Sequence, residues 1–292
     1  MTTIQSPEKV QDLLRDRAYL ADRGLATALY LAISLDKPLL LEGEAGVGKT
    51  EAARALAEAL GLRLIRLQCY EGIDAYQALY DWNYPKQLLH IRALSAAEAT
   101  GADVDELFGS EYLVERPLLA AIRAGRSALL LIDEIDRADD EFEAFLLEVL
   151  SDFAVTIPEI GTISAGERPL VILTSNRTRD LHDALKRRCL YHWIEYPSVE
   201  REVKILRARA PDVSETLTRQ VAAAVSRMRE LDLAKPPGIA EAIDWVQSLR
   251  TLGADGLERE AALGTLGAVL KEREDLELVE SALPEILPES DG

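Results

Sequence analysis

The sequence has few cysteines and histidines, few aromatic residues and no long apolar run. Its 292 residues include only Cys69 and Cys189, so neither a disulfide framework nor a thiolate zinc site is expected. The three histidines are far apart and lack a metal-ligand spacing. No basic segment followed by an apolar core opens the chain, and no apolar run approaches membrane-spanning length. These absences predict a cytoplasmic protein without membrane insertion.

Basic residues are also in short supply. The chain has 33 Lys and Arg against 51 Asp and Glu, which gives a formal net charge of −18. A field of this sign repels nucleic-acid backbones and anionic lipid surfaces. Nucleic acid is therefore not an expected partner. Hydrophobic residues make up 48% of the chain, which suffices for the cores of two domains.

A glycine-rich motif, G-x-x-x-x-G-K-T, stands out in the first fifth of the chain. An apolar strand is predicted over 38–41 before it, and a helix from Lys49 to Leu60 after it. Glycines let the backbone N–H groups of such a loop turn toward phosphate oxygens at the positive end of the helix dipole. The flanks disfavour a plain glycine turn, so we expect a nucleoside triphosphate to bind Gly43, Glu44, Ala45, Gly46, Val47, Gly48, Lys49 and Thr50.

Three polar residues follow two other predicted strands. Asp133 and Glu134 end the apolar run 127–132, and Asn176 ends the run 170–175. In a parallel sheet these ends meet at the edge that carries the glycine loop. Thr50 and Asp133 are the predicted Mg²⁺ residues, Asp133 through water, while Glu134 would polarise the attacking water. Asn176 would orient that water or contact the γ-phosphate, although an Asn here is also a common turn former.

The order of predicted elements indicates an α/β fold. Strands alternate with helices up to Pro197, as in a parallel sheet sandwiched by helices, with two short strands over 154–163. Helical spacing alone continues beyond Ser198. We therefore expect an α/β nucleotide-binding domain over 1–197, a small all-α lid domain over 198–270 and a frayed acidic tail over 271–292.

Aromatic residues concentrate in the segment from Cys69 to Pro85. Tyr70, Tyr76, Tyr80, Trp82 and Tyr84 occur there among polar residues and Gly72. The segment is either a contact site for a partner or a cap on the core, since aromatic side chains bury large areas wherever they lie.

These motifs together resemble the AAA+ ATPases, and among them the MoxR group. The likeness rests on Gly43 to Thr50, Leu131 to Arg137, the hairpin segment Ala154 to Gly161, Thr174 to Asn176, and Asp183 to Arg188. The run from Lys235 to Trp245 is most similar to the CoxD-like branch.

The resemblance implies a homo-hexameric ring that hydrolyses ATP with Mg²⁺ between subunits. Arg188 matches the arginine that enters the neighbour's site, and Arg187 is the second candidate. Without the likeness, this pair would be read as surface salt bridges. The lid stretch Pro237 to Ala240 lacks the arginine that the family brings to the γ-phosphate, and Lys235 is the nearest cation.

For function, the resemblance implies a remodelling chaperone. Such proteins act with a partner that bears a von Willebrand factor A domain, and the CoxD-like branch assists the maturation of a metalloenzyme client. The alternatives are a nucleotide-dependent DNA motor or loader, which the charge disfavours, and a nucleotide-gated binding switch with little turnover.

Overall fold

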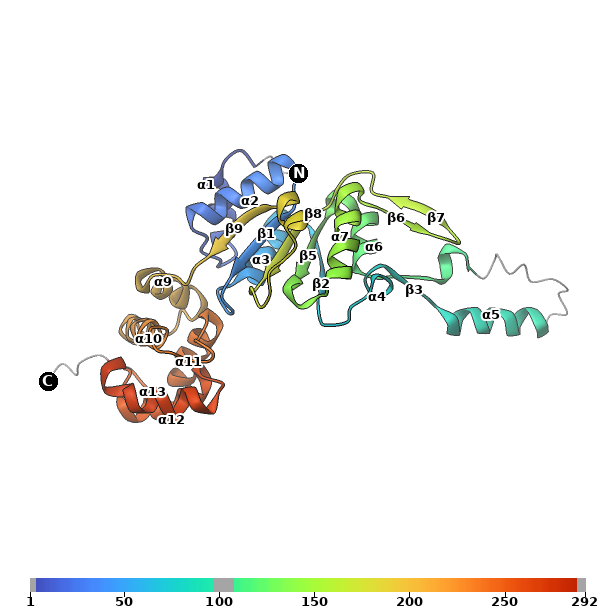
Figure 1. The fold of residues 1–292 in the computed structure, drawn as a ribbon. Helices are drawn as coiled ribbons and strands as arrows, with labels where there is room; N and C mark the ends of the chain where they lie inside the picture. Colours follow the sequence, from blue (N-terminus) through green and yellow to red (C-terminus); the bar gives the residue numbers. More distant parts are fainter. Residues whose placement is uncertain (1–3, 97–107, 288–292) are drawn as a thin grey trace. The chain divides into compact units, whose positions relative to one another are not determined.

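The computed structural model describes residues 4–96 and 108–287 (Figure 1). It divides into two compact units. The first comprises Met1–Leu13, Asp22–Glu42 and Ala53–His192, and the second comprises Leu14–Ala21, Gly43–Ala52 and Trp193–Gly292. In the described ranges, no helix combines the length and apolarity needed to cross a membrane.

A five-stranded sheet organises the α/β part of the chain. Its order is β2-β5-β8-β1-β9, and the β2–β5, β5–β8 and β8–β1 pairs are parallel. The strands are β1 (Leu39–Gly43), β2 (Arg63–Gln68), β5 (Ala128–Asp133), β8 (Leu170–Ser175) and β9 (Leu190–Ile194). Every residue of β5 is buried, as expected of an apolar strand covered on both faces. The predicted fold class is confirmed.

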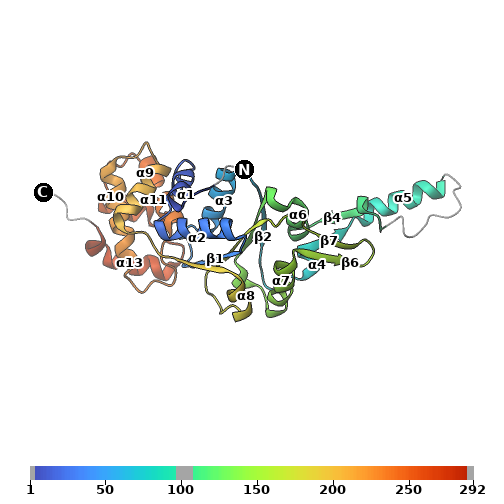
Figure 2. The ribbon, with the colours of Figure 1, turned by 90° about the horizontal axis from the view of Figure 1, so that it is seen from above.

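Helices flank this sheet (Figure 2). Several begin at a carboxylate cap: Asp22 accepts a hydrogen bond from the backbone N–H of Leu25, and Asp139 accepts one from that of Phe142. The helices are α1 (Pro7–Arg15), α2 (Arg23–Leu35), α3 (Lys49–Leu60), α6 (Pro117–Ala124), α7 (Asp140–Asp152) and α8 (Asp183–Arg188).

Two small antiparallel pairs accompany the sheet. β6 (Ala154–Ile157) and β7 (Gly161–Ser164) form the predicted hairpin before β8. β3 (Tyr80–Trp82) pairs with β4 (Leu113–Glu115), and α4 (Ala75–Leu79) and α5 (Tyr84–Ala96) lie on either side of β3 in the chain.

The aromatic segment contains both buried and exposed members. Tyr80 and Trp82 are buried and pack edge to face, with ring centroids 6.0 Å apart, so they cap the core. Tyr76 and Tyr84 are exposed at 68% and 58%. Tyr70 is also exposed, so Tyr70, Tyr76 and Tyr84 are the aromatic side chains of this segment that remain available for contacts with another molecule.

The two cysteines are sheltered from solvent. Cys69 is buried and Cys189 half-buried, and burial raises the pKa of each thiol to about 12. Both thiols are therefore neutral at physiological pH, and neither has the thiolate character of a nucleophile.

The second unit is helical beyond β9. Trp245 is fully buried in its core and donates a hydrogen bond from Nε1 to Thr265 Oγ1 at 2.8 Å. The helices are α9 (Val199–Arg209), α10 (Glu215–Met228), α11 (Ile239–Thr251), α12 (Arg259–Val269) and α13 (Arg273–Ile286).

The prediction of a frayed acidic tail over 271–292 is wrong for most of its length. Residues 273–286 form α13, whose Val279, Leu283 and Ile286 are buried in the helical core. Asp275 is also buried and accepts hydrogen bonds from the backbone N–H groups of Ala234 and Lys235. The high Glu content misled the sequence reasoning because it masks an apolar face with spacing i, i+4, i+7. Residues 288–292 lie outside the described part.

Candidate functional site

The glycine loop joins β1 to α3 in the backbone conformation that its glycines permit. Gly46 and Gly48 have φ of +77° and +94°, which residues with a side chain rarely adopt. A Cβ on Gly46 would also lie 2.7 Å from Cα of Gly238. Lys49 is buried, and its Nζ donates to the carbonyl oxygens of Gly43 and Glu44, at 2.7 Å each. Thr50 is the second residue of α3.

Donors from other parts of the second unit hold the carbonyl groups of this loop. Tyr196 donates its hydroxyl to Ala45 O at 3.3 Å, and the backbone N–H of Ile239 donates to Gly46 O at 2.9 Å. The Tyr19 hydroxyl lies 3.4 Å from Gly48 O. Burial raises the pKa of Tyr196, so its hydroxyl keeps the proton that it donates. The loop is thus anchored at the start of α11, and the sequence reasoning missed both tyrosines because no motif marks them.

A buried arginine supports the segment before α11. Arg229 forms two hydrogen bonds to the Glu202 carboxylate, at 2.7 and 2.8 Å, and donates from Nε to Pro237 O at 2.7 Å. Its guanidinium lies over the Tyr196 ring, 4.3 Å from the centroid. Burial raises the pKa of Glu202, and the guanidinium opposes that shift. Arg229 therefore fixes both Tyr196 and the turn that contacts Gly46.

Lys235, the predicted substitute for the lid arginine, is exposed. Its backbone N–H donates to Asp275 Oδ2 at 3.0 Å. The structure thus uses the main chain of Lys235 to attach α13, and a role of its ammonium group toward the γ-phosphate stays a prediction.

Replacing Arg229 should destabilise the second unit strongly. Arg229→Met leaves the Glu202 carboxylate buried without its partner, so we expect the free energy of unfolding to fall by about 3 kcal/mol or more. The measurement is urea unfolding followed by circular dichroism. Arg219→Met, which removes an exposed pair with Glu215, is the matched control and should change it by less than about 0.5 kcal/mol. Equal effects of the two substitutions would refute the assigned support role.

The acidic residues of the first unit meet at the carboxyl edge of the sheet. Asp133 is buried, and its Oδ1 accepts a hydrogen bond from the Thr174 hydroxyl at 2.5 Å. Its Oδ2 accepts two from the Arg66 guanidinium, at 2.9 and 2.5 Å. The parallel pairing of β2, β5 and β8 brings these three side chains together.

Glu134 follows directly in the left-handed backbone conformation, with φ of 56°. Its N–H donates to Thr174 Oγ1 at 2.9 Å, and its carboxylate accepts from Gln68 Nε2 at 3.0 Å and Arg137 Nε at 2.9 Å. Asn176 Nδ2 lies 3.5 Å from Glu134 Oε1. The structure therefore places three residues singled out in the sequence, Asp133, Glu134 and Asn176, in one cluster. Gln68 and Thr174 were missed, although each ends or nearly ends a strand at this edge.

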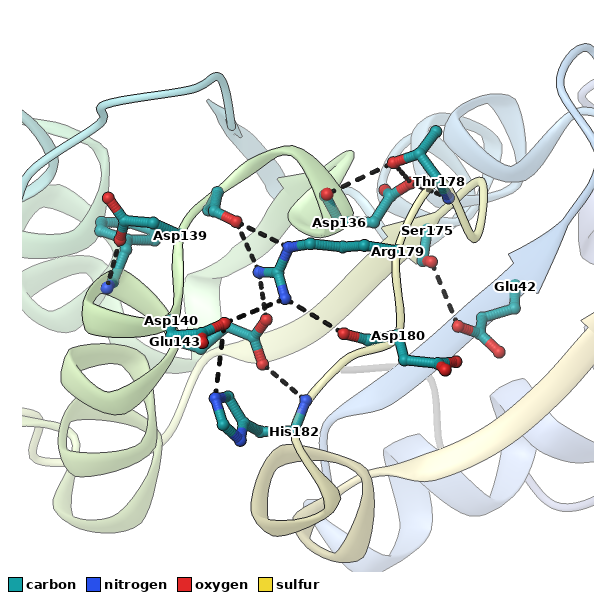
Figure 3. A network of polar contacts seen from close by, with 12 residues as sticks. Glu42, Asp136, Asp139, Asp140, Glu143, Ser175, Thr178, Arg179, Asp180 and His182 are labelled. Carbon is teal, nitrogen blue, oxygen red and sulfur yellow. Dashed lines mark hydrogen bonds and ion pairs between the residues drawn. The ribbon is translucent and has the colours of Figure 1, made fainter.

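A network of polar contacts continues from this edge to α8 (Figure 3). Ser175 donates to the buried Glu42 at 3.1 Å, at the end of β1 where the glycine loop begins. Arg179 donates from Nε to Ala138 O at 2.9 Å and forms an ion pair with Glu143, which is completely buried. The same Glu143 accepts from the backbone N–H of His182, the residue before α8. A partly buried charge pair thus fixes the position of α8 relative to α7.

The two arginines that end α8 differ in their surroundings. Arg188 donates from Nη1 to Leu147 O on α7. Arg187 is exposed and has no hydrogen bond or ion pair to the described part of the chain. Both arginines belong to the first unit, whereas the glycine loop belongs to the second unit.

Comparisons with known proteins agree with this arrangement. The RuvB Holliday junction branch migration motor of Thermotoga maritima matches with a TM-score of 0.51 and 18% identity, over 94% of this chain and 75% of that one. Domain III of the replication initiation protein DnaA of the same organism matches with a TM-score of 0.50 and 15% identity, over 88% and 96%. At these identities the likeness shows the fold alone.

The sequence also matches a family model over residues 38–189, from β1 to the end of α8. That range contains the glycine loop, Asp133, Glu134, Asn176 and both arginines of α8. Because the match covers more than half of the chain, the protein belongs to the AAA domain family, dynein-related subfamily.

Proposed function

We propose that the protein hydrolyses ATP and uses the energy to remodel other proteins, as a MoxR-type chaperone nearest to the CoxD-like branch. The cluster of Asp133, Glu134 and Asn176 carries the hydrolytic part of the proposal. Glu134 is about one-third exposed, which leaves its carboxylate accessible to a water molecule, and three neighbouring donors hold it. This combination suits a residue that accepts a proton at a fixed position.

The residues present fit ATP and Mg²⁺. Gly43 to Thr50 would hold the phosphates, with Lys49 as the buried ammonium among the loop carbonyls. Both carboxylate oxygens of Asp133 already accept hydrogen bonds, yet a carboxylate has about four lone-pair positions. Asp133 would therefore accept from a water ligand of the metal, and Thr50 would bind the metal directly. Bound Mg²⁺ supplies neutralisation of charge on the phosphate oxygens.

The other residues of the cluster position Glu134 and the attacking water. The Thr174 hydroxyl donates a hydrogen bond to Asp133 and accepts one from the backbone N–H of Glu134. One hydroxyl therefore orients the Asp133 carboxylate and holds the backbone of Glu134. Asn176 would hold the water that Glu134 deprotonates. Arg188, or Arg187, would act on a neighbouring subunit's nucleotide in a homo-hexameric ring, where its guanidinium stabilises the developing charge.

A protein client is favoured over nucleic acid by the charge of the chain. A net charge of −18 opposes the phosphate contacts that provide most non-specific nucleic-acid affinity. The exposed Tyr76 and Tyr84 instead suit a protein contact. The partner that we propose bears a von Willebrand factor A domain, and the client is a metalloenzyme undergoing maturation or metal-centre assembly.

The test is ATP turnover measured alone, with single-stranded DNA, and with a candidate partner that has such a domain. We expect slow basal turnover that the partner stimulates and that DNA leaves unchanged. Stimulation by DNA alone would favour the motor or loader, and tight ATP binding without turnover under any condition would favour the switch.

The exposed tyrosines provide a sharper test of partner contact. Tyr76→Ser together with Tyr84→Ser should leave basal turnover unchanged, because neither side chain belongs to the buried core, and should reduce partner stimulation about tenfold. Tyr80→Ser is the contrasting variant. Because Tyr80 is buried, this substitution should destabilise the fold and lower the unfolding temperature. Normal stimulation of the double variant would exclude this contact.

A further inference from the structure

A buried carboxylate near the carboxyl end of β1 has no part in the chemistry proposed above. Glu42 is 5% exposed and pairs in register with Ser175 of the neighbouring strand β8. Burial of a carboxylate costs free energy that an apolar side chain at the same position would avoid, even where hydrogen bonds offset part of that cost. A role besides stability is therefore expected for Glu42.

The Ser175 hydroxyl connects Glu42 to the turn that follows β8. It donates a hydrogen bond to Glu42 Oε1 at 3.1 Å (Figure 3). The hydroxyl oxygen also accepts a hydrogen bond from the backbone N–H of Arg177 at 3.1 Å. A hydroxyl has one proton and two lone pairs, so donation to Glu42 leaves the oxygen free to accept from Arg177. The carboxylate thus sets the direction of the hydrogen bond that closes the turn.

Asn176 is the residue that this turn presents. Arg177, the next residue, has φ of 56°, a left-handed conformation that residues with a side chain rarely adopt. Such a conformation persists only where the surrounding structure holds it, and the hydrogen bond to Ser175 is one such restraint. Asn176 lies in the chain between the two ends of this hydrogen bond, and its Nδ2 is 3.5 Å from Glu134 Oε1. Ser175 therefore restrains the backbone that carries the Asn176 amide.

Two hydroxyl groups attach the end of β8 to both of its neighbours in the sheet. Thr174 bonds to the acids at the end of β5, on one side of β8. Ser175 bonds to Glu42 of β1, on the other side. These are the last two residues before Asn176, so the position of its amide depends on both contacts.

The carboxylate of Glu42 also has a neighbour on β9, the strand on the other side of β1. Partial desolvation raises the pKa of Tyr191, and the Glu42 carboxylate raises it further, whereas Arg177 opposes the shift. The Tyr191 hydroxyl therefore keeps its proton beside Glu42. Protonated hydroxyl groups from β8 and β9 thus surround the carboxylate.

We propose that Glu42 is a positioning residue for ATP hydrolysis, which acts through the Ser175 hydroxyl on the turn that presents Asn176 to the attacking water. This inference rests on the proposed roles of Asn176 and Glu134. The acceptor oxygen of Glu42 is the property that matters, because Ser175 needs a partner for its proton and not a negative charge. The proposal assigns Glu42 no contact with nucleotide, so its loss should slow hydrolysis without weakening nucleotide binding.

Glu42→Leu removes the acceptor and keeps a similar volume. In the full-length protein, kcat for ATP should fall about tenfold, as for the loss of one hydrogen bond, while the affinity for a fluorescent ATP analogue should not change. Glu42→Gln keeps an oxygen that can accept from Ser175 and should retain most of the turnover. Glu280→Leu, the matched change of an exposed carboxylate on α13, should alter neither property. Weaker nucleotide binding by Glu42→Leu, or an equal loss of turnover in Glu42→Gln, would overturn the proposal.

A double-mutant cycle with Asn176→Ala tests whether Glu42 acts through Asn176. Without the Asn176 amide its orientation no longer matters, so adding Glu42→Leu should not slow turnover further. Effects that multiply would refute the positioning role of Glu42 and leave the role of Asn176 intact, because a general loosening of the fold does not require that amide. Turnover of Asn176→Ala at the parent rate would instead refute the proposed role of Asn176, and this inference with it.

Ser175→Ala is a smaller change that carries the same test if Glu42→Leu fails to fold. It removes the hydroxyl that links Glu42 to the turn, so it should reproduce the loss of kcat and add nothing to Asn176→Ala. Thermal unfolding checks that each variant is folded. A folded Ser175→Ala protein with the turnover of the parent would overturn the proposal, because the path from Glu42 to Asn176 passes through this hydroxyl.

Discussion

Glu134→Gln is expected to bind ATP as the parent does and to hydrolyse it at least about 100-fold more slowly. The amide has the size of the carboxylate, and its one oxygen can still accept a hydrogen bond from Gln68 or from Asn176, which donate to different oxygens of Glu134. It cannot take a proton from water. Binding is measured with a fluorescent ATP analogue, and turnover by release of phosphate.

Two companion variants make this result specific. Lys49→Ala removes the ammonium group of the glycine loop and should abolish nucleotide binding itself, whereas Glu134→Gln should preserve it. Glu280→Gln, the same chemical change on the surface of α13, should affect neither property. Turnover of Glu134→Gln at the parent rate would show that another group activates the water.

The parts of this architecture that were predictable from the sequence are those set by local pattern. Apolar runs such as 127–132 predict central strands because both of their faces are covered, and the position of Asp133 then follows from the parallel order. The glycine loop was predictable from its motif and flanks. The grouping of Asp133, Glu134 and Asn176 needed only the rule that parallel strands end at one edge.

The rest depends on partners that are distant in sequence. Arg229 contacts Glu202 and Pro237 through packing between helices of the second unit, and no local pattern marks it. The acidic composition of 273–286 concealed a helix, because only the apolar residues on its buried face contact the core of the second unit. The aromatic segment divided into buried and exposed members, since the pairing of β3 with β4 decides which side chains face inward.

Arg188→Ala should bind ATP normally and hydrolyse it at least about 100-fold more slowly, because in the proposed ring the missing guanidinium would act on the neighbour's nucleotide. Arg188 also donates to Leu147 O, so its loss removes a link between α8 and α7. Arg188→Lys, which keeps the charge but not the planar fork, therefore accompanies it. Arg187→Ala is the matched test of the adjacent, unattached arginine. If Arg187→Ala alone lost turnover, the role would belong to Arg187.

Mixing variants separates an arginine that acts across subunits from one that acts on its own site. In the proposed arrangement, mixed rings of Arg188→Ala and Glu134→Gln subunits would contain interfaces where an intact Glu134 faces an intact Arg188. Such rings should recover part of the parent turnover, although neither variant is active alone. Subunit exchange is verified first by energy transfer between labelled copies. An arginine that acts within its own subunit cannot be supplied by a neighbour. Subunit exchange without any recovery of turnover would therefore exclude action of Arg188 across the interface. Its remaining role would be the hydrogen bond to Leu147 O.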